Sequence, residues 1–213
     1  DGILRWGAAA GELVLKPTDQ CGGRGVTLLD TRGDDAWRQT LRTCLTAKQQ
    51  YLVEQRIVPH PFLARYNASS VNTVRYNTIC RGDEVQCFGA FLFTGRAGSF
   101  VNNGAQGGII APIDKATGRL VADGCDKCGQ RYAVHPDSGV AFCGEQVPQW
   151  ERLVALTTAM ARQIRSCTFV AWDMTLTHDG WEPVEANLGE FLAQQICLGR
   201  GLRDEFERAA GLR

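Results

Sequence analysis

The chain has 213 residues, of which 44% are hydrophobic, and its 23 basic residues balance its 23 acidic ones. This length and apolar content are enough to bury a core in one or two lobes. The balanced charge gives no general attraction to nucleic acid or to anionic membranes, and no run approaches the roughly 20 apolar residues of a membrane-spanning helix. We therefore expect no nucleic-acid partner and no membrane insertion.

The chain contains nine cysteines, an odd number, and most of them lie inside apolar stretches. Buried free thiols are typical of a reducing compartment, whereas disulfide frameworks are typical of secreted proteins. No basic-then-apolar leader opens the sequence, so we expect a cytoplasmic location. The sequence starts at Asp1 without a methionine. This is typical of a processed product or, as we expect here, of a domain excised from a longer protein with an upstream part.

A glycine-rich turn joins two apolar runs near the start of the chain. Residues 12–16 and 26–29 predict short strands, and residues 18–25 between them contain three glycines. Glycines without a Cβ let successive backbone N–H groups approach phosphate oxygens, and Lys16 can add a positive charge there. The pattern differs from a Walker motif, in which Gly-Lys-Ser/Thr opens a helix, so we do not expect a P-loop NTPase. The alternative is a hairpin tip without a ligand.

A helix and a strand follow this hairpin. Asp34 or Asp35 is placed to cap a helix that runs to about residue 48 and packs one apolar face on the sheet. Residues 51–57 predict a strand, whose position suits a connector between two lobes. The backbone of such a connector can contact an adenine edge, with Glu54 nearby. The alternative is an ordinary strand with Glu54 in a surface salt bridge.

Residues 70–80 and 84–93 predict a β-hairpin that turns at Gly82. Arg75 alternates with apolar neighbours and therefore faces away from them. If it faces a cleft, its guanidinium suits a transferring phosphoryl or acyl phosphate group; otherwise it faces solvent. Residues 98–110 form a loop rich in glycine and amide side chains, which suits the close approach of a ligand.

Residues 123–144 form an irregular segment with two interpretations. One is a structural zinc site built from a Cys-x-x-C pair with a later histidine and cysteine. A strong zinc signal would include a second Cys-x-x-C pair, which the segment does not have. The other interpretation is a substrate-side loop over residues 135–139. The zinc set would consist of Cys125, Cys128, His135 and Cys143.

Residues 169–187 predict a hairpin that carries three oxygen ligands. Asp173 lies on the first strand, and Glu185 and Asn187, two positions apart, share one face of the second. Asp173 and Glu185 are twelve positions apart. This even spacing sets them opposite each other only if the loop between the strands has an odd number of residues. A three-residue loop that ends in a left-handed Gly180 meets this condition. The three oxygens suit Mg²⁺ carrying phosphates; the alternative is a surface hairpin with ordinary polar residues.

Helical spacing marks three segments in the last third of the chain. Residues 148–165 predict an amphipathic helix that packs behind the ligand-bearing strands. Residues 191–198 and 202–210 predict two short helices to which we assign no chemistry.

Taken together, these segments resemble the ATP-grasp superfamily, and specifically its sugar-transfer-associated branch, found near polysaccharide biosynthesis. Nearly the whole chain is covered, and the match is carried by LVLKPTDQCGGRGV, YLVEQRI, SVNTVRYNTI, GSFVNNGAQGGIIAPID and AWDMTLTHDGWEPVEAN. The resemblance implies an α+β ATP-grasp fold of two lobes, with antiparallel sheets flanked by helices that grip ATP. Residues 1–57 would form the small lobe, and residues 58–213 the large lobe with the metal and substrate side.

The resemblance also implies roles for individual residues. Lys16 matches the phosphate-binding lysine, and Arg75 matches the arginine of the Asn-Thr-Val-Arg motif; both are expected to be catalytic. Asn102 stands where an acidic residue is expected, and Ala171 where ATP-grasp ligases often carry an arginine, so Arg75 has to act alone. The implied contacts are, for the nucleotide, Gly22, Gly23, Arg24, Gly25, Glu54, Gln55, Ile57 and Asn103, and, for Mg²⁺ or possibly Mn²⁺, Asp173, Glu185 and Asn187.

The resemblance implies an ATP- and Mg²⁺-dependent ligase that joins a carboxylate to an amine through an acyl phosphate, in polysaccharide or cell-envelope biosynthesis. Its substrates would be small molecules or glycan precursors. Such transfers depend on positioning and electrostatics rather than on a protein nucleophile. Two alternatives remain: a kinase that phosphorylates a sugar or lipid-linked hydroxyl, and a non-catalytic ATP-binding module that regulates a glycan machine.

Overall fold

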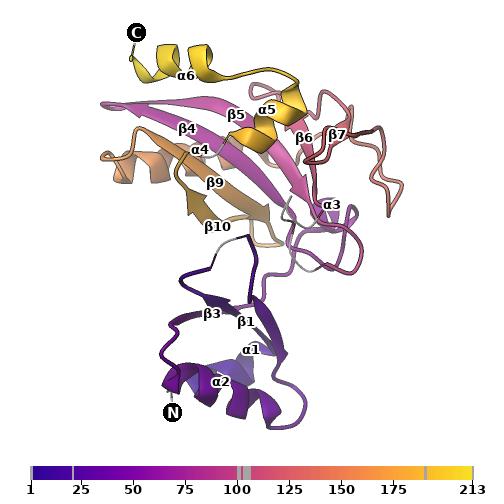
Figure 1. The fold of residues 1–213 in the computed structure, drawn as a ribbon, viewed down its shortest axis with the longest axis vertical. Coiled ribbons are helices and arrows are strands. Elements are labelled where there is room, and N and C mark those ends of the chain that lie inside the picture. Colours follow the sequence, from indigo (N-terminus) through magenta and orange to yellow (C-terminus); the bar gives the residue numbers. More distant parts are fainter. Residues whose placement is uncertain (1, 21, 100–101, 103–106, 190, 213) are drawn as a thin grey trace. The chain divides into compact units, whose positions relative to one another are not determined.

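The computed structural model describes residues 2–20, 22–99, 102, 107–189 and 191–212. The chain divides into two compact units, Asp1–Ile57 and Val58–Arg213, and colour follows the sequence through both in Figure 1. Each unit has an antiparallel sheet, flanking helices and its own buried apolar core. This arrangement confirms the predicted α+β fold class. The helices of the described residues are too short or too polar to span a lipid bilayer.

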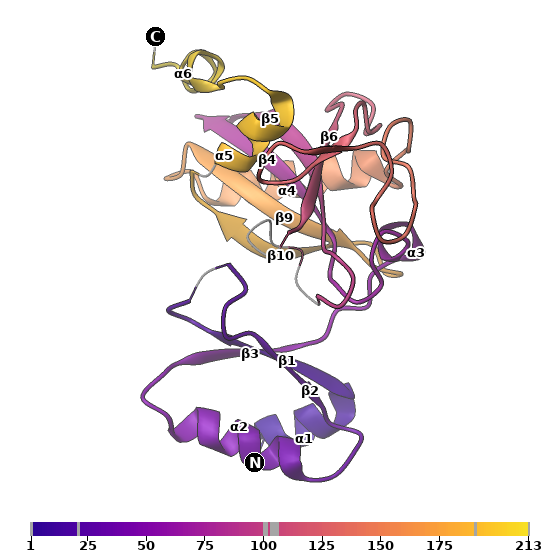
Figure 2. The same cartoon turned by 45° about the vertical axis from the view of Figure 1, so that its right-hand side comes forward.

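The described part of the first unit contains a three-stranded sheet in the order β2-β1-β3. Its elements are α1 (Gly2–Ala10), β1 (Glu12–Pro17), β2 (Thr27–Asp30), α2 (Ala36–Thr46) and β3 (Tyr51–Gln55). Figure 2 shows both helices on the same side of this sheet. Leu13 and Leu15 of β1 pack on that side against Trp37 and Leu41 of α2. Because strand side chains alternate, Lys16 faces away from the helices.

Helix α1 lies outside the elements that the sequence predicts. It packs closely on α2, because a Cβ at the buried Gly7 would lie only 2.9 Å from the Trp37 ring. The Thr31 hydroxyl also donates to the Gly7 carbonyl at 2.8 Å. Helix α2 begins where the sequence predicts, and the Asp34 carboxylate accepts a bond from the Ala36 amide at 3.0 Å. Two helices, rather than the single predicted one, thus pack on the sheet to form the core of the small unit.

Within the described residues, the second unit contains a seven-stranded sheet in the order β10-β9-β4-β5-β6-β7-β8. Its strands are β4 (Thr73–Arg81), β5 (Glu84–Thr94), β6 (Ile109–Ile113), β7 (Gly124–Cys125), β8 (Arg131–Tyr132), β9 (Phe169–Leu176) and β10 (Trp181–Asn187). Both predicted hairpins, β4–β5 and β9–β10, are present. They join through antiparallel pairing of β4 with β9. This pairing, which the sequence does not reveal, brings their polar residues together.

Helices cover the two faces of the large sheet. Helix α4 (Trp150–Gln163) lies on one face, and α5 (Leu192–Leu198) and α6 (Arg203–Ala210) lie on the other (Figures 1 and 2). A fourth, short helix, α3 (Pro61–Ala64), precedes β4. Trp150 and Leu153 of α4 pack with Val74 and Tyr76 of β4 in the main core. Arg75 therefore faces the side of α5 and α6, as the alternation predicts.

The turn between β9 and β10 differs from the predicted three-residue loop. Leu176 pairs with Trp181, and the Thr177 amide donates to the Gly180 carbonyl at 2.8 Å. The connection is therefore a tight turn over the two residues between Thr177 and Gly180. Gly180 has φ +131°, which differs from the left-handed value of about +57°. The predicted loop is wrong.

A β-bulge in β10 supplies the extra residue instead. The register shifts between Pro183 and Glu185, after which Glu185 pairs with Asp173. Proline has no N–H for the ladder and is confined to edge strands and bulges, and β10 lies at one edge of this sheet. The bulge, rather than the turn, sets Glu185 opposite Asp173.

Candidate active site

A row of charged side chains crosses three strands of the large sheet. Glu185 on β10 pairs with Asp173 on β9, and Asp173 pairs with Arg75 on β4. Directly opposed residues on antiparallel strands have Cβ atoms about 4.5–5.5 Å apart on one face. The row therefore holds two negative charges and one positive charge next to each other.

Arg75 and Asp173 form a two-pronged ion pair within this row. The Arg75 Nε and Nη2 atoms donate to the two Asp173 carboxylate oxygens, each at 2.7 Å. Both side chains are only 11% exposed, and the guanidinium lies over the Phe93 ring with 4.6 Å to its centroid. Removing one partner of a buried ion pair typically costs about 3–5 kcal/mol. The pair therefore fixes the direction of both charged groups.

The three predicted metal ligands lie on these neighbouring strands. Asn187 donates through Nδ2 to an Asp173 oxygen at 3.2 Å, and Glu185, exposed, is the register partner of Asp173. Two carboxylates and an amide oxygen are ligands that Mg²⁺ and Mn²⁺ accept. The described residues contain no cluster of three or more His, Cys, Asp or Glu side chains suited to a metal, so a site here needs the amide. This donor set fits a divalent cation.

Asn77 lies two positions after Arg75 on the same face of β4, between Ala171 on β9 and Gly89 on β5. Its side chain is 1% exposed, and neither amide atom has a hydrogen-bond partner among the described residues. Leaving a buried polar group unpaired typically costs about 1–3 kcal/mol. The sequence pattern alone does not single out this residue. Its position two residues after Arg75 sets its face, but its burial and lack of a partner depend on the distant strands around it.

In the first unit, Lys16 forms an ion pair with Glu54 on the sheet face opposite the helices. The two side chains are 31% and 34% exposed. Leu52, the register partner of Lys16, is 50% exposed beside them and was not predicted. Gln55 is exposed at the end of β3, and Ile57 lies beyond that strand. This ion pair corresponds to the alternative given above for Glu54, a surface salt bridge.

The glycine-rich turn between β1 and β2 requires glycine at several positions. Gly22, Gly23 and Gly25 have φ of 69°, 72° and 71°, which other residues adopt only with strain. A Cβ at Gly25 would also lie 2.9 Å from the Pro17 ring. Arg24 lies among these glycines. The three glycines leave the backbone bare at their own positions, which suits the predicted phosphate contact.

The second glycine-rich and amide-rich segment is described only in part. The Asn102 amide donates to the Thr73 hydroxyl at 2.8 Å, so Asn102 contacts the Asn-Thr-Val-Arg motif through its second residue. Asn103, predicted to bind nucleotide, lies outside the described residues.

The zinc set proposed for the irregular segment is not assembled. His135 is fully buried; its Nε2 lies 3.0 Å from the Gly95 carbonyl oxygen, and its Nδ1 accepts the Asp137 amide at 3.4 Å. Both ring nitrogens thus contact the backbone, and burial lowers the pKa of His135, which favours the neutral ring. The cysteines of the set differ in exposure: Cys125 is buried, whereas Cys128 and Cys143 are exposed. These four residues do not form a metal-binding cluster among the described residues, so the zinc interpretation is wrong.

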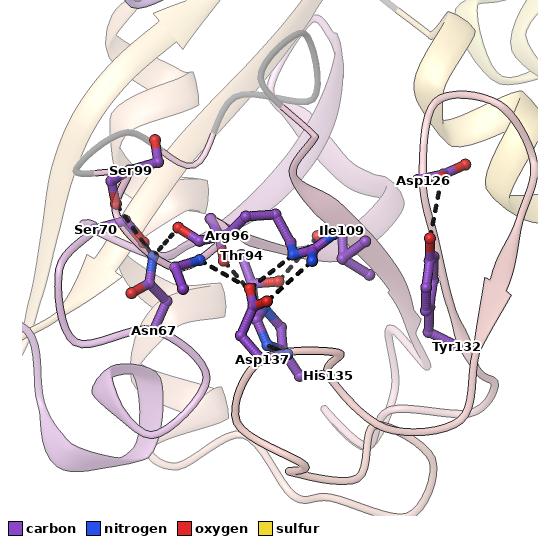
Figure 3. A network of polar contacts seen from close by, with 12 residues as sticks. Asn67, Ser70, Thr94, Arg96, Ser99, Ile109, Asp126, Tyr132, His135 and Asp137 are labelled. Carbon is purple, nitrogen blue, oxygen red and sulfur yellow. Dashed lines mark hydrogen bonds and ion pairs between the residues drawn. The ribbon is translucent and has the colours of Figure 1, made fainter.

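His135 instead belongs to a polar network at the end of β5 (Figure 3). Arg96 donates through Nε and Nη2 to the Asp137 carboxylate at 2.7 and 2.9 Å, and the Ala97 amide donates to it at 2.8 Å. The hydrogen bonds from Arg96 lower the pKa of Asp137 to about 2. Asn67 donates to the carbonyls of Arg96 and Ser99 at 2.9 and 3.2 Å. The network holds the backbone where β5 ends.

Comparison with known proteins adds the family. The sequence profile of the sugar-transfer-associated ATP-grasp family matches residues 6–210. The chain belongs to this family. No curated protein sequence matches this ATP-grasp chain.

Two solved structures resemble the ATP-grasp chain. D-cycloserine synthetase DcsG has a TM-score of 0.50 and 14% identity, over 100% of this chain and 59% of that protein. D-alanyl-alanine synthetase A from Vibrio cholerae O1 biovar eltor str. N16961 has a TM-score of 0.49 and 12% identity, over 99% and 55%. At these identities the likeness concerns the fold alone. The chain spans less than two thirds of the length of either protein.

Proposed function

We propose that this chain supplies the ATP- and Mg²⁺-dependent part of a ligase that joins a carboxylate to an amine, or to a similar nucleophile, in polysaccharide or cell-envelope biosynthesis. The observation that carries the proposal is the row of Glu185, Asp173 and Arg75 in a member of the ATP-grasp family. Two carboxylates suit a divalent cation, and the neighbouring guanidinium suits a phosphoryl or acyl phosphate group. These are the charges that a phosphoryl transfer to an acid requires.

The proposed reaction has two steps. A carboxylate oxygen attacks the γ-phosphorus of ATP, and the bond from that phosphorus to the β,γ-bridging oxygen breaks. ADP is the leaving group, and the product is an acyl phosphate. The amine nitrogen then attacks the acyl carbon, inorganic phosphate leaves, and the nitrogen loses a proton. Bound Mg²⁺ supplies charge neutralisation at the phosphate oxygens. No protein nucleophile is needed, because positioning and electrostatics carry such transfers.

In this proposal the residues of the large lobe, 58–213, have separate tasks. Asp173, Glu185 and Asn187 hold the cation, and Asp173 also holds Arg75 in place through their ion pair. Arg75 stabilises the negative charge that develops on the transferred group, since a fixed donor in a water-poor site acts strongly there.

The small lobe, residues 1–57, binds the nucleotide in this proposal. The backbone of Gly22, Gly23, Arg24 and Gly25 and the Lys16 ammonium contact phosphates, while Glu54, Gln55 and Ile57 contact adenine. Because Lys16 pairs with Glu54 in the structure, a triphosphate has to compete with this carboxylate for the ammonium. The exposed Leu52 side chain on the same face offers an apolar surface for a planar base.

Trapping with hydroxylamine tests the proposal. The full-length protein is incubated with ATP, Mg²⁺, hydroxylamine and single acids from a panel of sugar acids, hydroxy acids and amino acids. An acyl phosphate gives a hydroxamate together with ADP and phosphate, and the Glu185→Gln variant is expected to lose both products. ATP binding without hydroxamate for any acid contradicts the ligase proposal. A stable phosphoester formed from a sugar alcohol would identify a kinase instead, and ATP binding without any turnover a regulatory module.

A further inference from the structure

Two buried asparagines near the charged row differ sharply in their hydrogen bonding. Asn72, fully buried just before β4, donates to the carbonyls of Leu63 and Asn67 at 2.8 and 2.9 Å. Its oxygen accepts bonds from the Ser70 hydroxyl at 2.7 Å and the Gly95 amide at 3.0 Å. Asn77, equally buried, has no such bond within the described residues. The fold thus satisfies one amide completely and leaves the other unpaired.

The unpaired amide lies next to the row that we propose to be catalytic. Along β4, Asn77 and Arg75 are two positions apart on one face, which separates their Cα atoms by about 7 Å. Across the sheet, the neighbours of Asn77 are Ala171 and Gly89, which have a methyl group and no side chain. Asn187 is the next partner beyond Ala171. Small residues therefore flank Asn77 on both adjacent strands, and Ala171 on β9 separates it from Asn187 on β10.

The surroundings of Asn77 restrict what it can bind. Ala171 and Ile79, its register partner and its next neighbour on the same face, pack in an apolar cluster with Phe169 and Phe191. On the other side, a Cβ at Gly89 would lie 3.1 Å from the Phe91 ring and 3.8 Å from the Asn77 amide nitrogen. A neutral amide between apolar walls offers two donors and one acceptor. It matches a hydroxyl or carboxamide group better than a charged phosphate.

We propose that Asn77 determines substrate specificity by binding a hydroxyl or carboxamide group on the carboxylate substrate. The inference rests on the proposed ligase function. The substrate's carboxylate end lies at Arg75, and a neutral polar group on the Asn77 side of that carboxylate completes the hydrogen bonds of Asn77. The substrate class is therefore a carboxylic acid with a hydroxyl or amide substituent near its carboxylate. An acid without this group leaves the amide unpaired, and such sites reject the analogue strongly.

Asn77→Leu, with Asn72→Leu as the matched control, separates a ligand-binding amide from a structural one. Replacing an unpaired buried amide by an apolar side chain of similar shape is expected to raise stability. We expect Asn77→Leu to raise the Tm of the ligand-free protein by about 2 °C or more. Asn72→Leu removes four bonds and lowers the Tm. A fall in Tm for Asn77→Leu as large as that for Asn72→Leu shows a structural amide and contradicts the inference.

Paired acids supply the second readout. ATP turnover is compared for 3-hydroxybutyrate against butyrate and for gluconate against hexanoate, in the wild type and in Asn77→Leu. The wild type is expected to prefer at least one hydroxylated acid by about tenfold or more in kcat/KM, and Asn77→Leu to lose that preference while its KM for ATP stays unchanged. Equal preference in both proteins contradicts the inference.

A binding measurement distinguishes failure of this inference from failure of the ligase proposal. If the wild type turns over none of these acids, the ligase proposal fails for them, and the thermal shift caused by each acid decides the role of Asn77. A shift with the hydroxylated acids that disappears in Asn77→Leu supports the inference. A shift that survives the substitution, or no shift with any acid at millimolar concentration, overturns it.

Discussion

Two arginine–aspartate pairs in the large unit share one bonding pattern but have different surroundings. In each, Nε and Nη2 of the arginine donate to the two carboxylate oxygens, at 2.7 and 2.7 Å for Arg75 with Asp173 and at 2.7 and 2.9 Å for Arg96 with Asp137. The first pair is 11% exposed on both sides, and the second is 37% and 23% exposed.

The groups around the two pairs differ. Asp137 also accepts the Ala97 amide, and the Arg96 carbonyl accepts Asn67, so the second pair is part of a network that ties backbone segments together. Asp173 instead has Glu185 as its register partner and Asn187 as a hydrogen-bond donor, and the unpaired Asn77 lies two positions from Arg75 along β4. The first pair thus lies among groups suited to a ligand, and the second among groups that hold the fold.

The largest expected effect comes from removing negative charge from the row of Glu185, Asp173 and Arg75, which contains the first pair. Asp173→Asn and Glu185→Gln are expected to lower ATP-dependent turnover by about 100-fold or more, because each removes a negative charge from the proposed cation site. Asp137→Asn, the matched substitution in the second pair, is expected to lower it by about tenfold or less. Steady-state kinetics with the active acid from the trapping panel measures all three. Equal losses for Asp137→Asn and Glu185→Gln would remove the distinction between the pairs.

A smaller effect is expected when each arginine is replaced by lysine. Lysine keeps the charge but loses the two-pronged geometry, so Arg75→Lys should lower kcat by roughly 10- to 100-fold while the KM for ATP changes little. Arg96→Lys should affect mainly the Tm. Kinetics and thermal unfolding are measured on the same preparations. A drop in Tm for Arg75→Lys with unchanged kcat would make the first pair structural as well.

The smallest effect concerns the stability that Asp137 provides. Its hydrogen bonds with Arg96 lower its pKa from 3.8 to about 2, so the folded state favours the ionised carboxylate. This contribution is present above pH 3.8 and is lost as the pH falls through about 2. Asp137→Asn is expected to lower the Tm at pH 7 by about 2–8 °C, from a loss of about 1–2 kcal/mol.

The pH dependence provides the control for this prediction. The difference in Tm between the wild type and Asp137→Asn should shrink from pH 4 to pH 2, because the wild-type carboxyl is then increasingly protonated. A constant difference over this range would show that the substitution acts through packing rather than through the ion pair.

The sequence predicts the parts of this site that depend on local pattern. Alternation along β4 places Arg75 opposite Val74, and the core confirms it. The glycines between β1 and β2 mark a turn, and in the structure Gly22 and Gly25 have positive φ within it. These features follow from the two-residue period of a strand and from backbone sterics. Both act over a few residues and can be read directly from the sequence.

Features that depend on distant segments escape the sequence. The register that sets Asp173 opposite Glu185 can come from the length of the turn or from a bulge in one strand. A bulge at Pro183 is acceptable because β10 lies at an edge of the sheet, and this edge position depends on how all the strands are ordered. His135 lies near cysteines in the sequence, yet its ring contacts the Gly95 carbonyl 40 residues away. The unpaired state of Asn77 likewise depends on residues contributed by β5 and β9.

Binding of Mn²⁺ in the presence of a non-hydrolysable ATP analogue tests the central claim most directly, because it requires neither a known acid nor turnover. The full-length wild type, Glu185→Gln and Asp137→Asn are each titrated with Mn²⁺, and electron paramagnetic resonance measures the free Mn²⁺. This experiment compares the two regions in one measurement. We predict that Glu185→Gln weakens Mn²⁺ binding by about tenfold or more, whereas Asp137→Asn binds like the wild type. Equal Mn²⁺ affinity in the wild type and Glu185→Gln would contradict the assignment of the cation site.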